Sequence, residues 1–188
     1  MPSNTMKRIR SLGIGLVILV STVLLNGCAE LRSPAGVERL GAPIEGYNHS
    51  NTAAINRFTI NGSGGSGINP SSGGGQTCCV VLPVTWQPGL KVVVEWEEDP
   101  TPFSSRELSE KPFTEAWRER MHEQREHYTQ HRVEVEVAPY DRLGAASVHF
   151  LPCNQVKVTG GIKTYRHPDY PYNYPLNMEE PEQCPTTP

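Results

Sequence analysis

The chain has 188 residues, of which 37% are hydrophobic and 20% charged, and its formal net charge at pH 7 is −3. This length suits one domain, which can bury most of its apolar surface and needs no metal to fold. The acidic balance argues against nucleic acid and anionic lipid as electrostatic partners and favours a basic protein partner.

The N-terminus has the layout of a bacterial signal peptide. Three basic residues precede an uncharged apolar run over 12–25, as in a secretory leader. At about 14 residues, the run is shorter than the roughly 20 that a membrane-spanning helix needs. It ends in Leu-Asn-Gly-Cys at 25–28, the pattern at which lipoprotein signal peptidase cuts. We therefore predict a signal peptide over 1–27 and lipid attachment at Cys28, with an ordinary secretory signal as the alternative.

The residue that follows Cys28 sets the expected location. It is Ala29 rather than aspartate. Resemblance to enterobacterial lipoproteins, in which aspartate there commonly retains the protein at the inner membrane, implies an outer-membrane anchor that faces the periplasm. Removal of the leader takes three of the 17 basic residues and none of the 20 acidic ones, so the mature chain has a net charge near −6.

Four cysteines remain once Cys28 carries lipid, and an even number in an exported chain predicts two disulfides. Cys78 and Cys79 lie in an apolar run typical of a strand, so their side chains should point to opposite faces and bond to separate partners. Cys153 and Cys184 are the candidates. A ring joining Cys78 to Cys79 is the alternative, disfavoured because it strains the peptide between them. A metal site is less favoured still, because no Cys-x-x-Cys pair is present.

The first part of the mature chain, 28–46, is expected to be a tether, since it is rich in proline and glycine and lacks periodicity. Apolar and polar residues then alternate over 47–60, which predicts a strand, and Asn61-Gly62 is a strong hairpin signal. The glycine-rich stretches 63–67 and 71–75 lack the Gly-Lys-Ser/Thr ending of a phosphate-binding loop. We expect a flexible loop there.

Further strands are expected where β-branched and apolar residues run together or alternate with polar ones. The period changes to that of an amphipathic helix over 112–130, where Phe113, Trp117 and Met121 form an apolar stripe. The other predicted strands are 78–82, 90–96, 133–137, 146–151 and 155–159.

The last segment, 165–188, carries six prolines and four tyrosines without a period, so we expect it to run extended over the surface. The elements together predict a mainly β fold, an antiparallel β-sandwich over 47–164 with one inserted amphipathic helix.

No catalytic arrangement stands out, and we expect neither enzyme activity nor a cofactor. His127 and His131 stand one helical turn apart but lack the glutamate of a His-Glu-x-x-His metal site, and solvated histidines are favoured. The carboxylates of Glu97, Glu98 and Asp99 are interpreted as an acidic patch rather than an acid–base pair. This patch is a candidate partner-binding surface.

Three tyrosines of the last segment form a second candidate surface: Tyr170, Tyr172 and Tyr174. Aromatic residues exposed in an extended segment are good contact residues. The alternative is that these side chains pack across the surface of their own domain.

An ordered series of motifs runs through the mature chain: Tyr47-Asn48-His49-Ser50, Phe58-Thr59-Ile60-Asn61-Gly62, Gly73-Gly74-Gly75 before Cys78-Cys79-Val80, Leu82-Pro83, Trp86-Gln87-Pro88-Gly89-Leu90, and Val148-His149-Phe150-Leu151-Pro152. The series resembles a proteobacterial lipoprotein family of unknown function, and the likeness spans most of the mature chain. Members are found beside type VI secretion phospholipase effectors. The resemblance implies an immunity protein that binds and blocks a secreted lipase in the periplasm, and it assigns no contact residues.

Two other functions compete with this expectation. One is a structural or ligand-binding lipoprotein of the envelope, which would act as a carbohydrate or protein adaptor. The other is a hydrolase, which would need a nucleophile and a base within reach of each other and would draw on His49 or His149.

Overall fold

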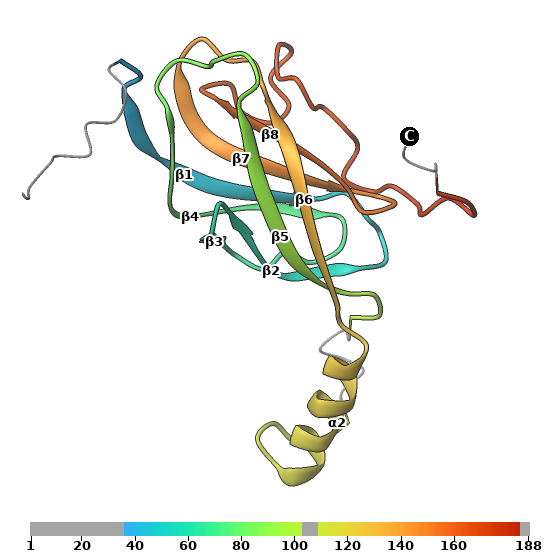
Figure 1. Cartoon of the computed structure of the whole chain (residues 1–188). Coiled ribbons are helices and arrows are strands. Elements are labelled where there is room, and N and C mark those ends of the chain that lie inside the picture. The colour runs from blue at the N-terminus through green and yellow to red at the C-terminus, as the bar shows by residue number, and fades with distance from the viewer. Residues whose placement is uncertain (1–35, 103–108, 185–188) are drawn as a thin grey trace, which may run out of the picture. The chain divides into compact units, whose positions relative to one another are not determined.

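One eight-stranded sheet makes up most of the described chain, and one helix is inserted between its fifth and sixth strands (Figure 1). The computed structural model describes residues 36–102 and 109–184, and the expected signal peptide over 1–27 and Cys28 lie outside them. The elements are β1 Arg39–Asn48, β2 Ala54–Ile60, β3 Ser63–Gly65, β4 Ser72–Pro83, β5 Lys91–Asp99, α2 Glu115–Glu126, β6 Thr129–Ala138, β7 Leu143–Leu151 and β8 Gln155–Gly161.

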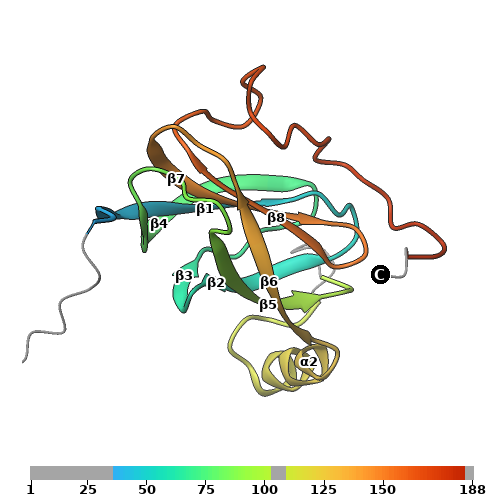
Figure 2. The same cartoon turned by 45° about the horizontal axis from the view of Figure 1, so that its top comes forward.

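The strands form one mixed sheet that curls over its own core (Figure 2). Its order is β3-β2-β5-β6-β8-β7-β1-β4. The pairs β1–β7 and β6–β8 are parallel, and the other neighbours are antiparallel. The outermost strands, β3 and β4, lie beside each other, because Thr77 Oγ1 of β4 donates a hydrogen bond to Gly64 O of β3 at 2.8 Å.

The predicted mainly β fold with one inserted helix is confirmed, but the strands are not divided into the two antiparallel sheets of a sandwich. β6 pairs with β5 from Thr129 to Glu136 and with β8 at Val137 and Ala138. One long strand therefore belongs to both halves of the sheet. The two layers that a sandwich would have are joined through β6 into a single curled sheet.

The core lies between the two halves of this sheet. The Phe58 ring of β2 packs edge-on against Phe150 of β7 with centroids 5.2 Å apart, and Trp96 of β5 lies 5.6 Å from the same Phe150 ring. Aromatic pairs of this geometry contribute roughly 0.5–1.5 kcal/mol beyond the burial of their area. These contacts hold the β2–β5 half against the β7–β1 half.

The N-terminal strands differ from the sequence expectation at their boundaries. β1 begins at Arg39, so residues 39–46 of the expected tether form a strand, and the expected strand over 47–60 is interrupted between β1 and β2. The hairpin at Asn61-Gly62 is confirmed, because both residues have positive φ angles, 49° and 81°, as a two-residue type I′ turn requires.

The glycine-rich stretches expected to be a loop contribute instead to β3 and β4. Their glycines allow aromatic rings to lie directly on the backbone. A Cβ atom added to Gly65 would lie 2.0 Å from Cζ of Phe58, and one added to Gly73 would lie 2.3 Å from Cδ1 of Tyr47. Glycine here makes room for the rings of buried Phe58 and half-buried Tyr47, a role that composition alone does not distinguish from loop flexibility.

Replacing Gly65 with alanine is expected to destabilise the protein by about 1–3 kcal/mol, because the added methyl overpacks the site. The Phe58 ring cannot move away, since it is held by Phe150. The matched control is Gly64→Ala in the same strand, where an added Cβ meets no atom within 4 Å. Urea denaturation of both variants tests this, and equal losses of stability would contradict it.

Helix α2 is shorter than the helix expected over 112–130. Thr114 is its N-cap and accepts a hydrogen bond from the backbone N–H of Trp117 at 3.3 Å, which satisfies one of the free donors of the first turn. The helix ends at His127, and β6 begins at Thr129. His131 therefore lies on a strand, stacked on Trp96 at 4.8 Å, and cannot form a helical metal pair with His127.

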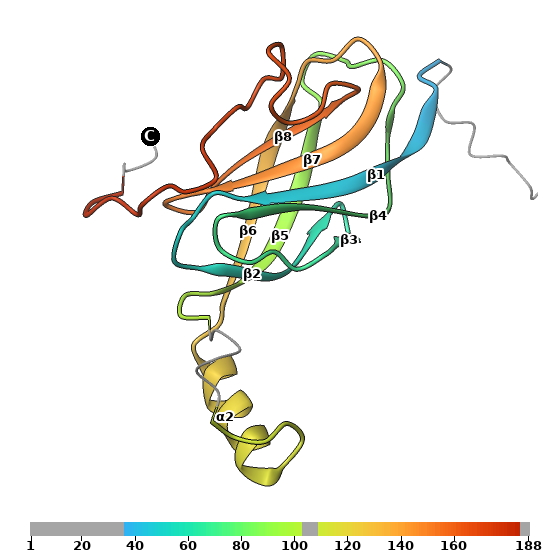
Figure 3. The same cartoon turned by 180° about the vertical axis from the view of Figure 1, so that it is seen from behind.

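Helix α2 projects from the end of the sheet where β5 ends and β6 begins (Figure 3). Gln124 is its one buried residue. The Gln124 Nε2 group donates to Asp99 Oδ1 and to the backbone carbonyl of Thr101, both at 2.8 Å. Two hydrogen bonds of the buried Gln124 thus fasten the base of the helix. Across the described residues, no helix combines the length and the apolar character needed to cross a membrane.

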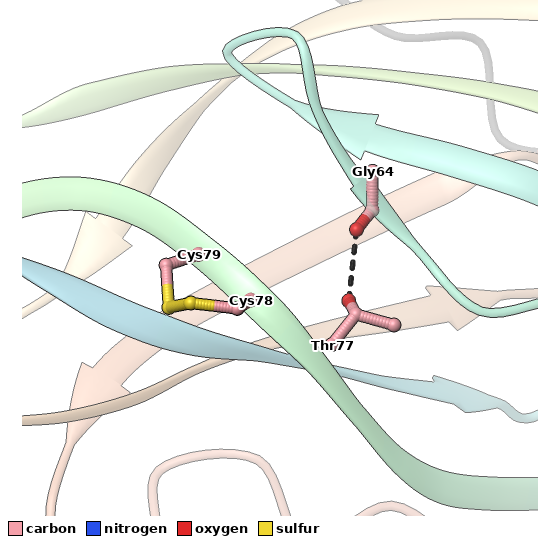
Figure 4. The surroundings of a disulfide bond; sticks show 4 residues. All are labelled: Gly64, Thr77, Cys78 and Cys79. Atoms are coloured by element: carbon pink, nitrogen blue, oxygen red, sulfur yellow. Dashed lines mark hydrogen bonds between the residues drawn. A yellow bond between two sulfur atoms is a disulfide. The ribbon is translucent and has the colours of Figure 1, made fainter.

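The disulfide pairing differs from the favoured prediction. Cys78 bonds to its neighbour Cys79 on β4 (Figure 4), and Cys153 bonds to Cys184. Cys153 follows β7, which β1 separates from β4 in the sheet, so it is not beside the two neighbouring cysteines. Its Cα instead lies 5.4 Å from that of Cys184, an ordinary disulfide spacing. The second bond fastens the C-terminal segment to the β7–β8 turn.

Candidate functional site

A cluster of histidine and tyrosine rings lies where the C-terminal segment crosses β1 and β7. We call it the histidine–tyrosine cluster, and its members are Tyr47, His49, His149, Tyr165, Tyr170, Tyr172 and Tyr174. The parallel pairing of β1 and β7 sets Tyr47 opposite His149. Met178 forms a strand-like bridge to Ser50, which brings the C-terminal segment alongside the end of β1.

Three hydrogen bonds run in series through the cluster. His49 Nδ1 lies 2.8 Å from the carbonyl oxygen of Pro175, His49 Nε2 lies 2.8 Å from His149 Nδ1, and His149 Nε2 lies 2.6 Å from the hydroxyl of Tyr170. Both histidines are fully buried. The series links β1 and β7 to two points of the C-terminal segment.

The direction of each hydrogen bond follows from the carbonyl at one end. A carbonyl only accepts, so His49 Nδ1 carries a proton, and in a neutral ring Nε2 is then an acceptor. His149 Nδ1–H must therefore donate to His49 Nε2, which leaves His149 Nε2 to accept from the Tyr170 hydroxyl. Both histidines are thus neutral Nδ1–H tautomers, assigned here by their partners.

Burial sets the protonation state of both rings. Desolvation, reinforced by the neighbouring His49, lowers the pKa of His149 to about 3. Desolvation also lowers the pKa of His49, against a smaller opposing effect of its bond to Pro175. A second reason is geometric, because protonating both rings would set two N–H groups against each other between His49 and His149. The neutral pair is the stable state at neutral pH.

A carboxylate lies at the edge of the cluster. Glu45 accepts hydrogen bonds from the hydroxyls of Tyr47 at 3.2 Å and of Ser147 at 3.3 Å. Burial and the adjacent Glu45 raise the pKa of Tyr47 to about 12. The Tyr47 ring stacks on His149 with centroids 4.9 Å apart. These contacts keep the tyrosine neutral and fix the plane of the imidazole.

The hydrogen bonds of this cluster hold its segments in position. The Ser147 hydroxyl donates its one proton to Glu45, so this cluster contains no serine–histidine hydrogen bond that would activate a nucleophile. A proton passed along the series would end at the Pro175 carbonyl, which has no proton to release. The cluster therefore seats the C-terminal segment on the sheet.

The predicted tyrosine surface belongs to this cluster. Tyr170 is only 4% exposed, and burial raises the pKa of its hydroxyl. Tyr172 and Tyr174 are half-buried and stack on each other with centroids 6.1 Å apart. The structure thus places the three side chains across their own domain, which was the alternative to an exposed contact surface.

The predicted acidic patch is not a solvated face. Glu97 accepts hydrogen bonds from Arg57 and Gln130, each at 2.6 Å. Asp99 is buried and bonded to Gln124 of α2. Burial, and secondarily the charge of Glu180, raises the pKa of Glu98. β5 carries these side chains at the sheet edge from which α2 departs, so most of their acceptor capacity serves the fold.

One group of metal-ligand atoms occurs among the described residues. It comprises Cys153, Glu180 and Cys184. The two sulfurs are bonded to each other, and Glu180 accepts a hydrogen bond from the backbone N–H of Cys153 at 2.9 Å. The carboxylate therefore caps the disulfide turn.

His49 and His149 are the residues of this site that sequence motifs did not bring together. They are separated by 100 residues, and each ends or interrupts an apolar strand. The sequence did contain one signal for this pair. His149 lies between Val148 and Phe150 in a strand that is buried on both faces, and a buried imidazole needs a hydrogen-bond partner.

Comparison with known proteins agrees with the motif series. No curated protein and no solved structure gives a significant match to the chain. A family model described as "Protein of unknown function (DUF3304)" matches residues 47–158, which include β2 to β7, both histidines and the vicinal cysteines. That match covers more than half of the chain, and the chain belongs to the DUF3304 family.

Proposed function

We propose that the protein is an envelope lipoprotein that binds and inhibits a type VI secretion lipase effector, as an immunity protein. The leader, the Leu-Asn-Gly-Cys sequence ending at Cys28 and the following Ala29 support a lipid anchor in the outer membrane that faces the periplasm. An inhibitor held at that surface is concentrated where a lipase would attack, without any further contact.

Helix α2 is the observation that carries the proposal. Phe113, at its N-terminal end, is 75% exposed, and its ring lies 5.3 Å from that of Trp117. Met121 continues the same stripe one turn further along and is partly exposed. Large aromatic side chains held in the open on a rigid element are typical anchors of a protein–protein contact.

The chemistry of this stripe fits the entrance of a lipase. A lipase must admit acyl chains, so the entrance to its active site is an apolar groove, and a projecting helix with an aromatic stripe can fill such a groove. The hydrogen bonds of the buried Gln124 hold the base of α2. Little ordering entropy is then lost on binding.

Removing the two anchors should weaken inhibition. If a lipase is encoded beside this protein, Phe113→Ala combined with Trp117→Ala is expected to weaken binding to that lipase by about 30-fold or more, the effect of losing at least 2 kcal/mol at a hot spot. Calorimetry with the purified lipase, and survival of cells that export it, measure the effect. The matched control is Glu126→Ala, on the opposite side of α2.

Two results would contradict the proposal. One is a wild-type protein that neither binds nor protects against the neighbouring lipase. The other is a double variant that protects as well as Glu126→Ala. A Cys28→Ser form in the same survival assay tests the anchor separately, and full protection by that form would show that the lipid is not needed.

A further inference from the structure

A second site lies at the end of the sheet where β5 begins and β6 ends. A pocket of about 510 Å³ opens there between the β4–β5 connection, the β6–β7 connection and the residues that follow β8. Figures 1 and 3 show these segments together, at the end of the sheet away from α2. The volume is within the range of small-molecule sites, roughly 300–1,000 Å³.

Two aromatic rings form part of its wall. Trp86 Nε1 donates to the backbone carbonyl of Val137 at 2.8 Å, and the Tyr140 hydroxyl donates to that of Pro83 at 2.6 Å. Both polar groups are therefore used within the sheet. What Trp86 and Tyr140 contribute to the pocket is ring carbon, in fixed positions.

Thr159 contributes an unused polar group. Its side chain lines the pocket and is only 3% exposed, yet its hydroxyl makes no hydrogen bond to any residue in the described part of the chain. Among the described residues, Asn51 Oδ1 is the only side-chain nitrogen or oxygen that has neither solvent exposure nor a hydrogen-bond partner. The unbonded Thr159 hydroxyl must therefore be partly exposed, and the space next to it is the pocket. A ligand that both donates and accepts would complete it.

The charges of the residues that line the pocket sum to zero. Arg142 and Lys163 supply two positive charges, and Asp141 and Asp169 supply two negative ones. Lys163 Nζ and Asp169 Oδ2 are 2.5 Å apart. Arg142 and Asp141 form no ion pair with the other described residues. The wall thus carries positive and negative charges in equal number and has no net charge.

We propose that this pocket binds a neutral carbohydrate of about disaccharide size. Sugar hydroxyls donate and accept at once, which matches the Thr159 hydroxyl, the donors of Arg142 and the acceptors of Asp141. The C–H faces of a sugar ring match the carbon surface of Trp86 and Tyr140. An anion would meet as many negative as positive charges and gain no net attraction, and an apolar ligand would leave the Thr159 hydroxyl unpaired.

Equilibrium dialysis with the full-length protein, in a detergent that contains no sugar, tests the site. The probes are radiolabelled N,N′-diacetylchitobiose and maltose, with radiolabelled inorganic phosphate as the anionic comparator. At least one disaccharide is expected to be retained, and phosphate is not. Thr159→Val and Arg142→Ala should each reduce sugar retention tenfold or more.

Matched controls are Thr59→Val and Arg118→Ala, which change the same residue types outside the pocket and should retain sugar like the wild type. Thermal unfolding confirms that each variant is folded, and exposed Arg142 can be replaced without disturbing the sheet even if Thr159→Val misfolds. Retention of neither disaccharide, tighter retention of phosphate, or full retention by folded Arg142→Ala would overturn the proposal. Because α2 lies elsewhere, a failed lipase assay does not affect this result.

Discussion

Replacement of His149 with alanine is expected to lower the free energy of unfolding by about 3–5 kcal/mol, as for other large buried side chains cut back to alanine. The ring is completely buried, stacks on Tyr47, and bonds to His49 and to Tyr170. The substitution leaves a cavity, and it also leaves the His49 Nε2 acceptor and the Tyr170 hydroxyl without partners. Each unpaired buried group adds to the loss.

Urea denaturation followed by tryptophan fluorescence measures this effect. The matched control is His122→Ala, because His122 is exposed on α2 and, within the described residues, interacts only with Glu126, at 3.5 Å. We expect the control to change stability by less than about 0.5 kcal/mol. A loss below about 1 kcal/mol for His149→Ala would show that the hydrogen-bond series does not organise the fold.

Acid should destabilise the protein through the same ring. The pKa of His149 is about 3 in the folded protein, below its ordinary value of 6.5, so between these values the unfolded chain binds more protons than the native one. Stability is then greatest above pH 6.5 and falls as the pH is lowered, by about 1.4 kcal/mol per pH unit. Between pH 7.5 and 4.5 the loss from His149 amounts to about 2–3 kcal/mol.

The lowered pKa of His49 acts in the same direction. Carboxylates also titrate in this range. The effect of His149 is therefore measured as the difference in pH dependence between the wild type and a variant without this imidazole. Unfolding free energies are determined at several pH values for the wild type and for His149→Gln, which cannot titrate. The wild type should show the steeper dependence, and parallel curves for the two proteins would contradict the assigned pKa.

Local patterns predicted the elements of the fold better than their arrangement. Strict alternation over 133–137 and the Asn61-Gly62 turn signal depend on neighbours in the sequence, and both are found as predicted. The parallel pairing of β1 with β7 joins segments about 100 residues apart, which no local period encodes. The sandwich prediction failed at β6, because no sequence feature marks a strand that changes partners along its length.

The candidate site shows the same limit. Tyr170 was found as an aromatic residue in an irregular segment, but its burial depends on a hydrogen bond to His149 that only the folded chain creates. The cysteine prediction assumed that neighbours on a regular strand face apart. Cys78 and Cys79 depart from that geometry to bond to each other. The sequence shows which residues carry polar or reactive groups. Which of these groups bond to each other depends on the topology of the folded chain.

The two disulfides do not interleave along the chain. Cys78 meets its partner one residue later, and Cys153 meets the next cysteine, 31 residues on. If the Cys28 thiol carries the proposed lipid, a polypeptide that emerges N-terminus first into an oxidising compartment, and whose other thiols are joined strictly in order of appearance, would acquire the native connectivity directly. Maturation of this domain would then depend on a thiol oxidase and not on an enzyme that reshuffles wrongly paired cysteines.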